Sequence, residues 1–311
     1  MRLKALKVVV IGNMKNRIAF FGASVTQQRN GYWKYFADNH KNFDVASFGY
    51  GSRHLNDAGV CYIDTVLDFE PDYCFIDWFS TGYIKYNEDK FYEIKEYINT
   101  IIHKFYSKGV KLIFLTFPDE TVDKTEIYVK INNYLKEQGI PVIDISKSFN
   151  DLKVILRDGI HTTDFGSSEY SRIISDIFFN EIYEKHSIPS TYVGKNKFCD
   201  IKMLELNIVA TEKIVLNGPC EVIGISQYIG PYTGLVKIDD KIFNNWDRWC
   251  HYEREMVNLK FNVNDTTVIE VLGDDFDRSA CEYKNVWNVN KCLKLLTAFY
   301  IGEQLVLKEY N

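Results

Sequence analysis

Residues Arg17 to Thr26 read Arg-Ile-Ala-Phe-Phe-Gly-Ala-Ser-Val-Thr and pass from an apolar run into three small residues. The run from Ile18 to Phe21 is typical of a buried strand. Gly22-Ala23-Ser24 allows a sharp turn and the close approach of a second backbone. Aromatic residues at helical spacing follow between Gly31 and His40, so the pattern predicts a strand, a turn and a helix. In an open α/β sheet such a turn lies at the carboxyl edge, where ligands bind, and Ser24 is therefore a candidate nucleophile. An ordinary turn with a capping serine also explains these residues when they are taken alone.

Apolar runs alternate with amphipathic stretches from Arg17 to about His186. The strands predicted from this pattern are 18–21, 43–48, 73–79, 112–117 and 142–145. The predicted helices are 31–40, 54–69, 88–107, 125–138 and 166–186. Regular alternation of this kind indicates right-handed βαβ crossovers and an α/β domain with helices on both faces of a parallel sheet.

The sequence pattern changes after Ser187-Ile188-Pro189-Ser190. Period-two apolar runs dominate from Cys199 onward, at roughly ten-residue spacing and separated by turn residues such as Asn217-Gly218-Pro219. This pattern predicts an antiparallel β-sandwich. The sequence thus predicts an α/β domain over residues 17–188 and a β-sandwich domain over residues 195–311.

Composition excludes several classes of partner. The 311 residues carry 37 Lys and Arg against 42 Asp and Glu, a net charge of −5, so we expect no nucleic-acid partner. No run reaches the roughly 20 apolar residues that span a membrane. The seven cysteines are odd in number and form no Cys-x-x-Cys pair, which favours free thiols and a cytoplasmic location. No metal-ligand spacing stands out, and we expect neither a metal nor another cofactor.

A second candidate motif lies between the last predicted strand and the last helix of the α/β domain. It reads Arg157-Asp158-Gly159-Ile160-His161. Gly159 allows the loop to curl, so that the Asp158 carboxylate accepts from one imidazole nitrogen of His161 while the other nitrogen faces outward. A serine nucleophile needs such a base, because the carboxylate fixes the tautomer and stabilises the imidazolium. Taken alone the motif also fits a surface turn, and its combination with Ser24 favours catalysis.

Two further loops bear on stabilisation of an oxyanion. Gly51 follows the second predicted strand and is expected to present a backbone N–H to a developing negative charge. Glycine at this point is equally explained by a tight turn that needs positive φ. Thr81 lies in the loop after the third strand, where a side-chain donor is wanted.

These motifs together resemble the SGNH, or GDSL-type, hydrolase superfamily over about residues 17–186. That family carries a Gly-Asp-Ser block, a glycine, a Gly-x-Asn-Asp block and an Asp-x-x-His block. Gly22-Ala23-Ser24 matches the first with alanine for aspartate, Gly51 the second, and Asp158 to His161 the fourth. The third block is absent, because Thr81 stands at the position of its asparagine, and threonine donates only one hydrogen bond.

The resemblance implies a flavodoxin-like sheet of about five strands and an ester hydrolase with Ser24, His161 and Asp158 as its triad. The backbone N–H groups of Ser24 and Gly51, with Thr81, would hold the oxyanion. An O-acetyl group on a carbohydrate, such as a bacterial surface polysaccharide, is the implied substrate. Two alternatives stay open: an O-acyltransferase that delivers the acyl group to a sugar, and a carbohydrate-binding protein whose catalytic site has decayed.

An aromatic group in the β-rich part is a candidate substrate-binding platform. Trp246, Trp249 and Tyr252 lie three residues apart among charged and amide side chains, a pattern that suits stacking on a sugar. A half-buried core with a polar rim explains the same residues.

Overall fold

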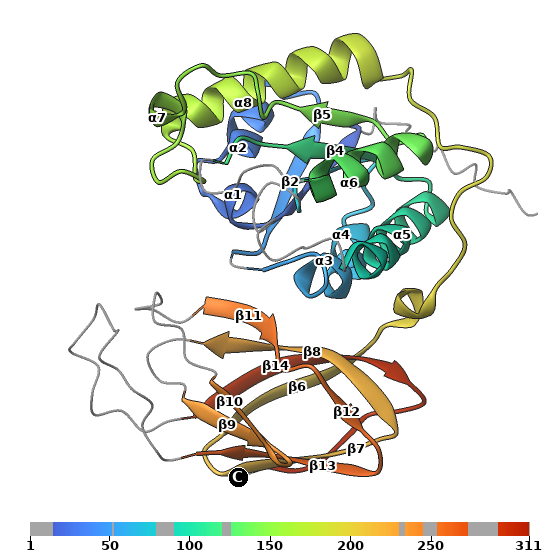
Figure 1. The fold of residues 1–311 in the computed structure, drawn as a ribbon, viewed down its shortest axis with the longest axis vertical. Helices are drawn as coiled ribbons and strands as arrows, with labels where there is room; N and C mark the ends of the chain where they lie inside the picture. The colour runs from blue at the N-terminus through green and yellow to red at the C-terminus, as the bar shows by residue number, and fades with distance from the viewer. Residues whose placement is uncertain are drawn as a thin grey trace, which may run out of the picture.

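The computed structural model describes residues 15–51, 53–78, 90–119, 126–229, 234–244, 254–272 and 292–310. The described chain forms an α/β unit and, after a connecting segment, a β-sandwich (Figure 1). The fold class predicted from the sequence is therefore confirmed.

The α/β sheet is parallel throughout and has the strand order β2-β1-β3-β4-β5. Its strands are β1 (Arg17–Gly22), β2 (Asp44–Gly49), β3 (Tyr73–Ile76), β4 (Lys111–Thr116) and β5 (Val142–Asp144). β1 lies between β2 and β3. Its residues Ile18 to Phe21 are fully buried, because helices cover both faces of the sheet. The turn after β1 therefore lies within the carboxyl edge of the sheet, as predicted.

Helices cover the two faces of this sheet. They are α1 (Ser24–Gln27), α2 (Tyr32–Asn39), α3 (Ala58–Cys61), α4 (Ile63–Leu67), α5 (Phe91–Ser107), α6 (Glu126–Glu137), α7 (Leu152–Ile155) and α8 (Asp164–Ile177). A π-helical turn, Phe178–Ile182, continues α8. Residues of α2 and α8 share one buried apolar cluster, whereas residues of α3 to α6 belong to the cluster on the other face. This arrangement is the doubly wound one expected from the alternating pattern.

Two predicted elements end differently in the structure. The helix predicted over 54–69 is two short helices. The Asp57 side chain caps the start of α3 by accepting from Ala58 N at 2.6 Å. Tyr62 leaves helical geometry and separates α3 from α4. The strand predicted over 73–79 ends at Ile76, and the Asp77 side chain instead bonds the turn after β1. The short helices α1 and α7 were not predicted.

The β-sandwich consists of two antiparallel sheets. Its strands are β6 (Lys202–Ala210), β7 (Lys213–Asn217), β8 (Cys220–Ile229), β9 (Leu235–Ile238), β10 (Lys241–Asn244), β11 (Arg254–Asn258), β12 (Phe261–Val263), β13 (Thr266–Val271), β14 (Leu293–Gly302) and β15 (Val306–Tyr310). One sheet has the order β10-β9-β13-β7-β15 and the other β11-β8-β14-β6, with β12 paired to β8. A short 3₁₀ helix, Lys197–Asp200, precedes β6. Strands β10 to β12 were not predicted, because each is short and mixes apolar with polar residues.

The sheet that contains β8, β11 and β14 faces α3 and α4 (Figure 1). Phe198, Ile223, Val257 and Phe299 belong to the same buried apolar cluster as the residues of α3 to α6. This shared cluster joins the two parts of the chain, while a further buried cluster lies on the other face of the α/β sheet and another lies inside the sandwich.

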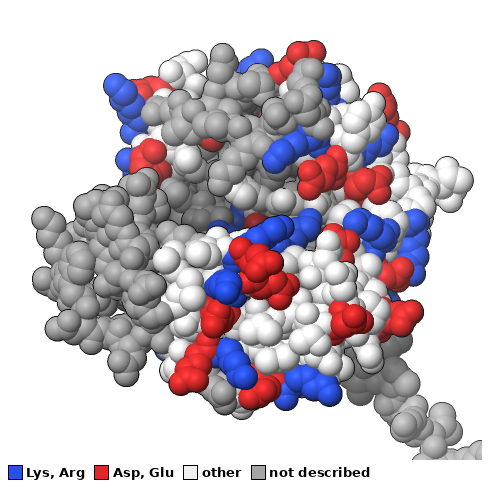
Figure 2. All heavy atoms as spheres, turned by 60° about the horizontal axis from the view of Figure 1, so that its bottom comes forward, with Lys and Arg blue, Asp and Glu red and all other residues white. Residues whose placement is uncertain are grey.

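Charged side chains of both signs are interspersed on the face of the molecule drawn in Figure 2. On the sandwich, Lys237 pairs with Glu270 at 3.7 Å and Lys213 pairs with Glu309 at 3.5 Å, in both cases between neighbouring strands. Among the described residues, no helix is long and apolar enough to cross a membrane.

Candidate active site

Ser24 is the first residue of α1 and follows the turn that ends β1. Gly22 is required in this turn because a Cβ built there would lie 1.2 Å from Asp77 Oδ1. The Ser24 side chain is half-buried, and its hydroxyl makes no hydrogen bond, to His161 or to any other residue in the described part of the chain. As the first residue of a helix, Ser24 also has a backbone N–H with no intrahelical acceptor.

Asp77 fixes the backbone just before Ser24. Its carboxylate accepts from Ala23 N at 2.8 Å and from Thr26 Oγ1 at 2.6 Å, so it contacts the turn on both sides of Ser24. Tyr32 Oη lies 2.7 Å from the same Thr26 hydroxyl. Complete burial raises the pKa of Asp77 to about 6, against the effect of the hydrogen bonds from Thr26 and Ala23. Sequence reasoning assigned no role to this residue, although a carboxylate that directly follows a fully apolar strand is an unusual pattern.

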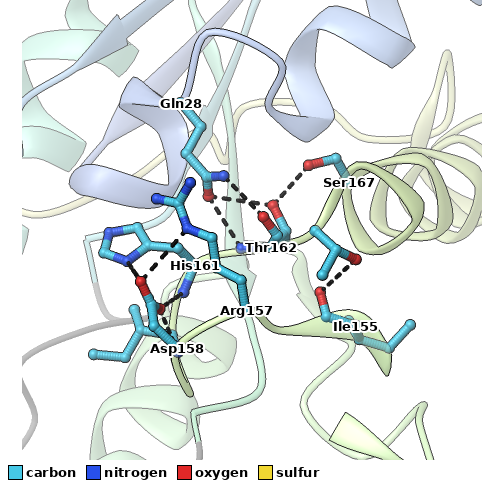
Figure 3. Close-up of polar contacts among 9 residues, drawn as sticks. Gln28, Ile155, Arg157, Asp158, His161, Thr162 and Ser167 are labelled. Carbon is cyan, nitrogen blue, oxygen red and sulfur yellow. Dashed lines mark hydrogen bonds and ion pairs between the residues drawn. The ribbon is translucent and has the colours of Figure 1, made fainter. Parts of the chain in front are cut away.

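Asp158 and His161 form the pair that the sequence predicted (Figure 3). His161 Nδ1 lies 2.9 Å from Asp158 Oδ2 and 3.0 Å from Oδ1. The carboxylate also accepts from the His161 backbone N–H at 2.8 Å. Partial burial raises the pKa of Asp158, but the hydrogen bonds from His161 outweigh this effect and leave the pKa below its usual value. Because an ionised carboxylate only accepts, Nδ1 carries the ring proton and Nε2 is left as a base.

The loop around this pair is held by local backbone geometry. Gly159 has φ of +82°, a conformation that favours glycine and that lets the chain curl as predicted. Thr163 is the N-cap of α8: its hydroxyl accepts from Gly166 N at 3.0 Å and donates to the carbonyl oxygen of Val154 at 2.9 Å. His161 thus precedes a capped helix that fixes its backbone.

Gln28 connects the end of α1 to the loop that carries His161 (Figure 3). Its Nε2 donates to the Thr162 carbonyl at 3.1 Å, and its Oε1 accepts from Thr162 N at 3.1 Å and from Thr162 Oγ1 at 3.2 Å. Ser24 lies one helical turn before Gln28, about 6 Å along the axis, and His161 directly precedes Thr162. Ser24 and the Asp158–His161 pair therefore belong to two segments that are bonded to each other. No local sequence pattern indicates this role of Gln28.

The loop after β2 packs closely on α1. A Cβ at Gly49 would lie 2.2 Å from the backbone N of Gln27, and one at Gly51 would lie 2.1 Å from Gln27 Oε1. Gly51 is buried, and within the described ranges its backbone N–H makes no hydrogen bond. Gly49 is thus required for close approach of two backbones, whereas the exposed Gln27 side chain could move away from a Cβ at Gly51. Neither glycine has the positive φ considered as the alternative.

The remaining predicted site residues lie outside the described residues. Thr81 falls in the segment 79–89, and Trp246, Trp249 and Tyr252 fall in the segment 245–253. In the ranges that the structure does describe, no three His, Cys, Asp or Glu side chains are grouped to hold a metal ion.

Comparison with solved structures places this arrangement among known folds. A two-domain esterase (CEX) active on acetylated mannans, co-crystallised with mannopentaose, superposes with a TM-score of 0.62 and 13% identity over 93% of this chain and 91% of that one. The chain has the fold of a two-domain esterase. A second crystal structure of the esterase gives a TM-score of 0.61 at 12% identity, and it covers 93% of this chain and 92% of that one.

A member of the lipolytic protein G-D-S-L family from Veillonella parvula DSM 2008 matches with a TM-score of 0.44 at 12% identity, over 53% of this chain and 98% of that one. No family model matches the sequence, and no curated protein matches it. The predicted architecture, a five-stranded parallel α/β sheet with an appended β-rich domain, is confirmed at the level of the fold.

Proposed function

We propose that the protein is a serine esterase that removes O-acetyl groups from a carbohydrate. The observation that carries this proposal is the Asp158–His161 pair and its connection to Ser24. Gln28 hydrogen-bonds the loop of this pair, and it directly follows α1, the helix that begins with Ser24. An alcohol, an imidazole with one free nitrogen and an orienting carboxylate are the three groups that acyl transfer through a serine requires.

Each residue has a defined part in the reaction. Ser24 Oγ attacks the carbonyl carbon of the ester while its proton passes to His161 Nε2. The tetrahedral intermediate collapses, the C–O bond to the sugar breaks, and His161 returns the proton to the leaving sugar oxygen. Water then attacks the acyl-Ser24 ester, with His161 again taking and returning a proton, and acetate is released. Asp158 holds the ring and stabilises the imidazolium.

The developing oxyanion needs donors that are not already bonded. The backbone N–H groups of Ser24 and Gly51 fill this role in our proposal, with Thr81 as the side-chain donor. Neither N–H group has an acceptor among the described residues, which supports the assignment. A preorganised donor of this kind typically lowers the barrier by about 2.7–4 kcal/mol.

A carbohydrate ester is the proposed substrate class because the full-length structural neighbour acts on acetylated mannans. The test is release of acetate from 4-nitrophenyl acetate and from acetylated glycans by the wild-type protein and by Ser24→Ala. Ser107→Ala, which changes an exposed serine at the end of α5, is the matched control.

We expect turnover that disappears with Ser24→Ala and persists in Ser107→Ala. Acetyl groups that appear on an added sugar instead of in free acetate would indicate the acyltransferase. Equal inactivity of the wild-type protein and Ser24→Ala on every ester would overturn the proposal. The carbohydrate-binding protein with a decayed catalytic site would then be the remaining alternative.

A further inference from the structure

The segment that follows β2 contacts the β-sandwich at two points. It includes Gly51 and runs on through α3 to Tyr62. Arg53, two residues after Gly51, donates from Nη1 to the Val257 carbonyl on β11 at 2.6 Å. Tyr62 hydrogen-bonds through its hydroxyl to Ser226 Oγ on β8 at 2.9 Å and to the Glu255 carboxylate on β11.

Tyr62 contacts the loop that contains Gly51 by stacking on the ring of Tyr50. Its ring lies parallel to that of Tyr50, with centroids 4.2 Å apart and an interplanar angle of 11°. Tyr50 in turn donates its backbone N–H to the Gly22 carbonyl at 2.9 Å. A chain of contacts thus leads from Glu255 and Ser226 of the sandwich to the turn that carries the nucleophile.

Both contacts are sheltered from water. The Tyr62 side chain is 8% exposed, and burial together with the Glu255 carboxylate raises the pKa of its hydroxyl far above the usual value, so the group remains a donor. The side chain of Arg53 is 16% exposed and also lies 3.7 Å from Asp57 Oδ2, the residue that caps α3. Hydrogen bonds in such surroundings hold their geometry better than exposed ones.

We infer that the β-sandwich positions the Gly51 loop for catalysis, with Tyr62 and Arg53 as the positioning residues. This inference rests on the proposed esterase function for its kinetic consequence. A displacement of the Gly51 N–H relative to Ser24 weakens stabilisation of the oxyanion and leaves binding of a small ester largely unchanged. The sandwich then acts on the rate of the chemical step through the loop.

The test uses the full chain and the variant Tyr62→Phe, which retains the stacked ring and removes the hydroxyl. Tyr134→Phe is the matched control, since Tyr134 is 7% exposed and its hydroxyl donates to Asn99 Oδ1 at 2.5 Å between α6 and α5. Arg53→Met removes the bond to Val257, and Arg53→Lys restores a donor there.

Two readouts are needed. Hydrogen–deuterium exchange of the peptide over residues 47–62 should quicken in Tyr62→Phe and Arg53→Met but not in Tyr134→Phe. On 4-nitrophenyl acetate, kcat should fall about tenfold in the same two variants with KM within about twofold, and Arg53→Lys should recover part of the loss.

The outcomes separate this inference from the proposed function. An inactive wild-type protein would overturn the proposed esterase function. Hydrogen–deuterium exchange alone would then decide whether the sandwich holds the Gly51 loop. Unchanged exchange in Tyr62→Phe and Arg53→Met would overturn the inference. An active, Ser24-dependent enzyme whose kcat is the same in Tyr62→Phe as in Tyr134→Phe would also overturn it.

Discussion

In the proposed mechanism, Asp158 acts on catalysis by orienting the His161 ring. In Asp158→Asn the amide no longer holds a proton on Nδ1 of His161, so the base is presented in the wrong tautomer. We expect kcat to fall at least about 100-fold with little change in KM. Steady-state kinetics on an activated acetyl ester measure this change, and a thermal melt serves as the folding control. Retention of more than half of the wild-type kcat would contradict the role given to Asp158.

Asp77 makes stability depend on pH in the direction opposite to that of most carboxylates. Its pKa of about 6 in the fold lies above the ordinary value, so the unfolded chain loses the proton first as pH rises. Below about pH 4 both states are protonated and the cost of burying the charge is absent. Between about pH 4 and pH 7 folding therefore loses up to about 3 kcal/mol through this group.

Denaturant unfolding of the wild-type protein and Asp77→Asn at several pH values measures this effect. The amide does not ionise, so the variant should gain stability relative to the wild-type protein as pH rises through this range. A difference between the two proteins that stays constant from pH 4 to pH 7 would show that Asp77 ionises as an ordinary aspartate.

Sequence reasoning at the scale of residues found the groups with distinctive chemistry. Ser24, Asp158 and His161 were predicted because a serine in a small-residue turn and an aspartate three residues before a histidine are informative patterns. Asp77 and Gln28 were not assigned, because their roles depend on which segments the fold brings together. Gln28 contacts Thr162 far along the chain, and no local pattern indicates such a contact.

At the scale of elements, the contact between α1 and the end of β2 leaves no room for a side chain at Gly49. Gly49→Ala would place its Cβ 2.2 Å from a backbone nitrogen, which a rotamer change does not relieve. We expect a loss of about 1–3 kcal/mol in the free energy of unfolding. Gly194→Ala is the control, because nothing lies within 4 Å of its Cβ, and its effect should stay within about 0.5 kcal/mol. Equal stability of the two variants would contradict this packing.

The connection between α1 and the histidine loop gives a second prediction at this scale. Gln28→Ala removes the hydrogen bonds to Thr162 and frees the two segments to move apart. We expect kcat to fall about tenfold, since misplaced reacting groups slow the chemical step. A Gln28→Ala enzyme with wild-type kcat would show that other contacts align Ser24 with His161.

Elements with a strong hydrophobic period were predicted well, and short ones were not. The five parallel strands and the long helices α5 and α6 follow from such patterns. The Asp57 side chain caps the start of α3, and the break before α4 lies at Tyr62, whose hydroxyl contacts the sandwich. A local amphipathic pattern misses both features. Strand β11 was missed for a related reason, since its pairing with β8 and its contact with Arg53 are both long-range.

At the scale of the whole molecule, a shared apolar cluster joins the two parts of the chain. Ile223, Val257 and Phe299 of the sandwich belong to the same cluster as the helices α3 to α6. We therefore expect one cooperative unfolding transition rather than two. Calorimetry of the full chain measures this, and two well-separated transitions would contradict the shared core. The sequence predicted two units but not their contact, because it arises from residues that lie far apart in the chain.

The central claim is that Ser24 and the Asp158–His161 pair act as one catalytic unit. Its most direct test is covalent labelling with a serine-directed fluorophosphonate, located by peptide mass spectrometry in the wild-type protein, Ser24→Ala and His161→Ala. We predict a single adduct on Ser24 in the wild-type protein, none at that site in Ser24→Ala, and labelling slowed at least about 100-fold in His161→Ala. An absent adduct, an adduct on another residue, or labelling of Ser24 at the same rate without His161 would contradict the account.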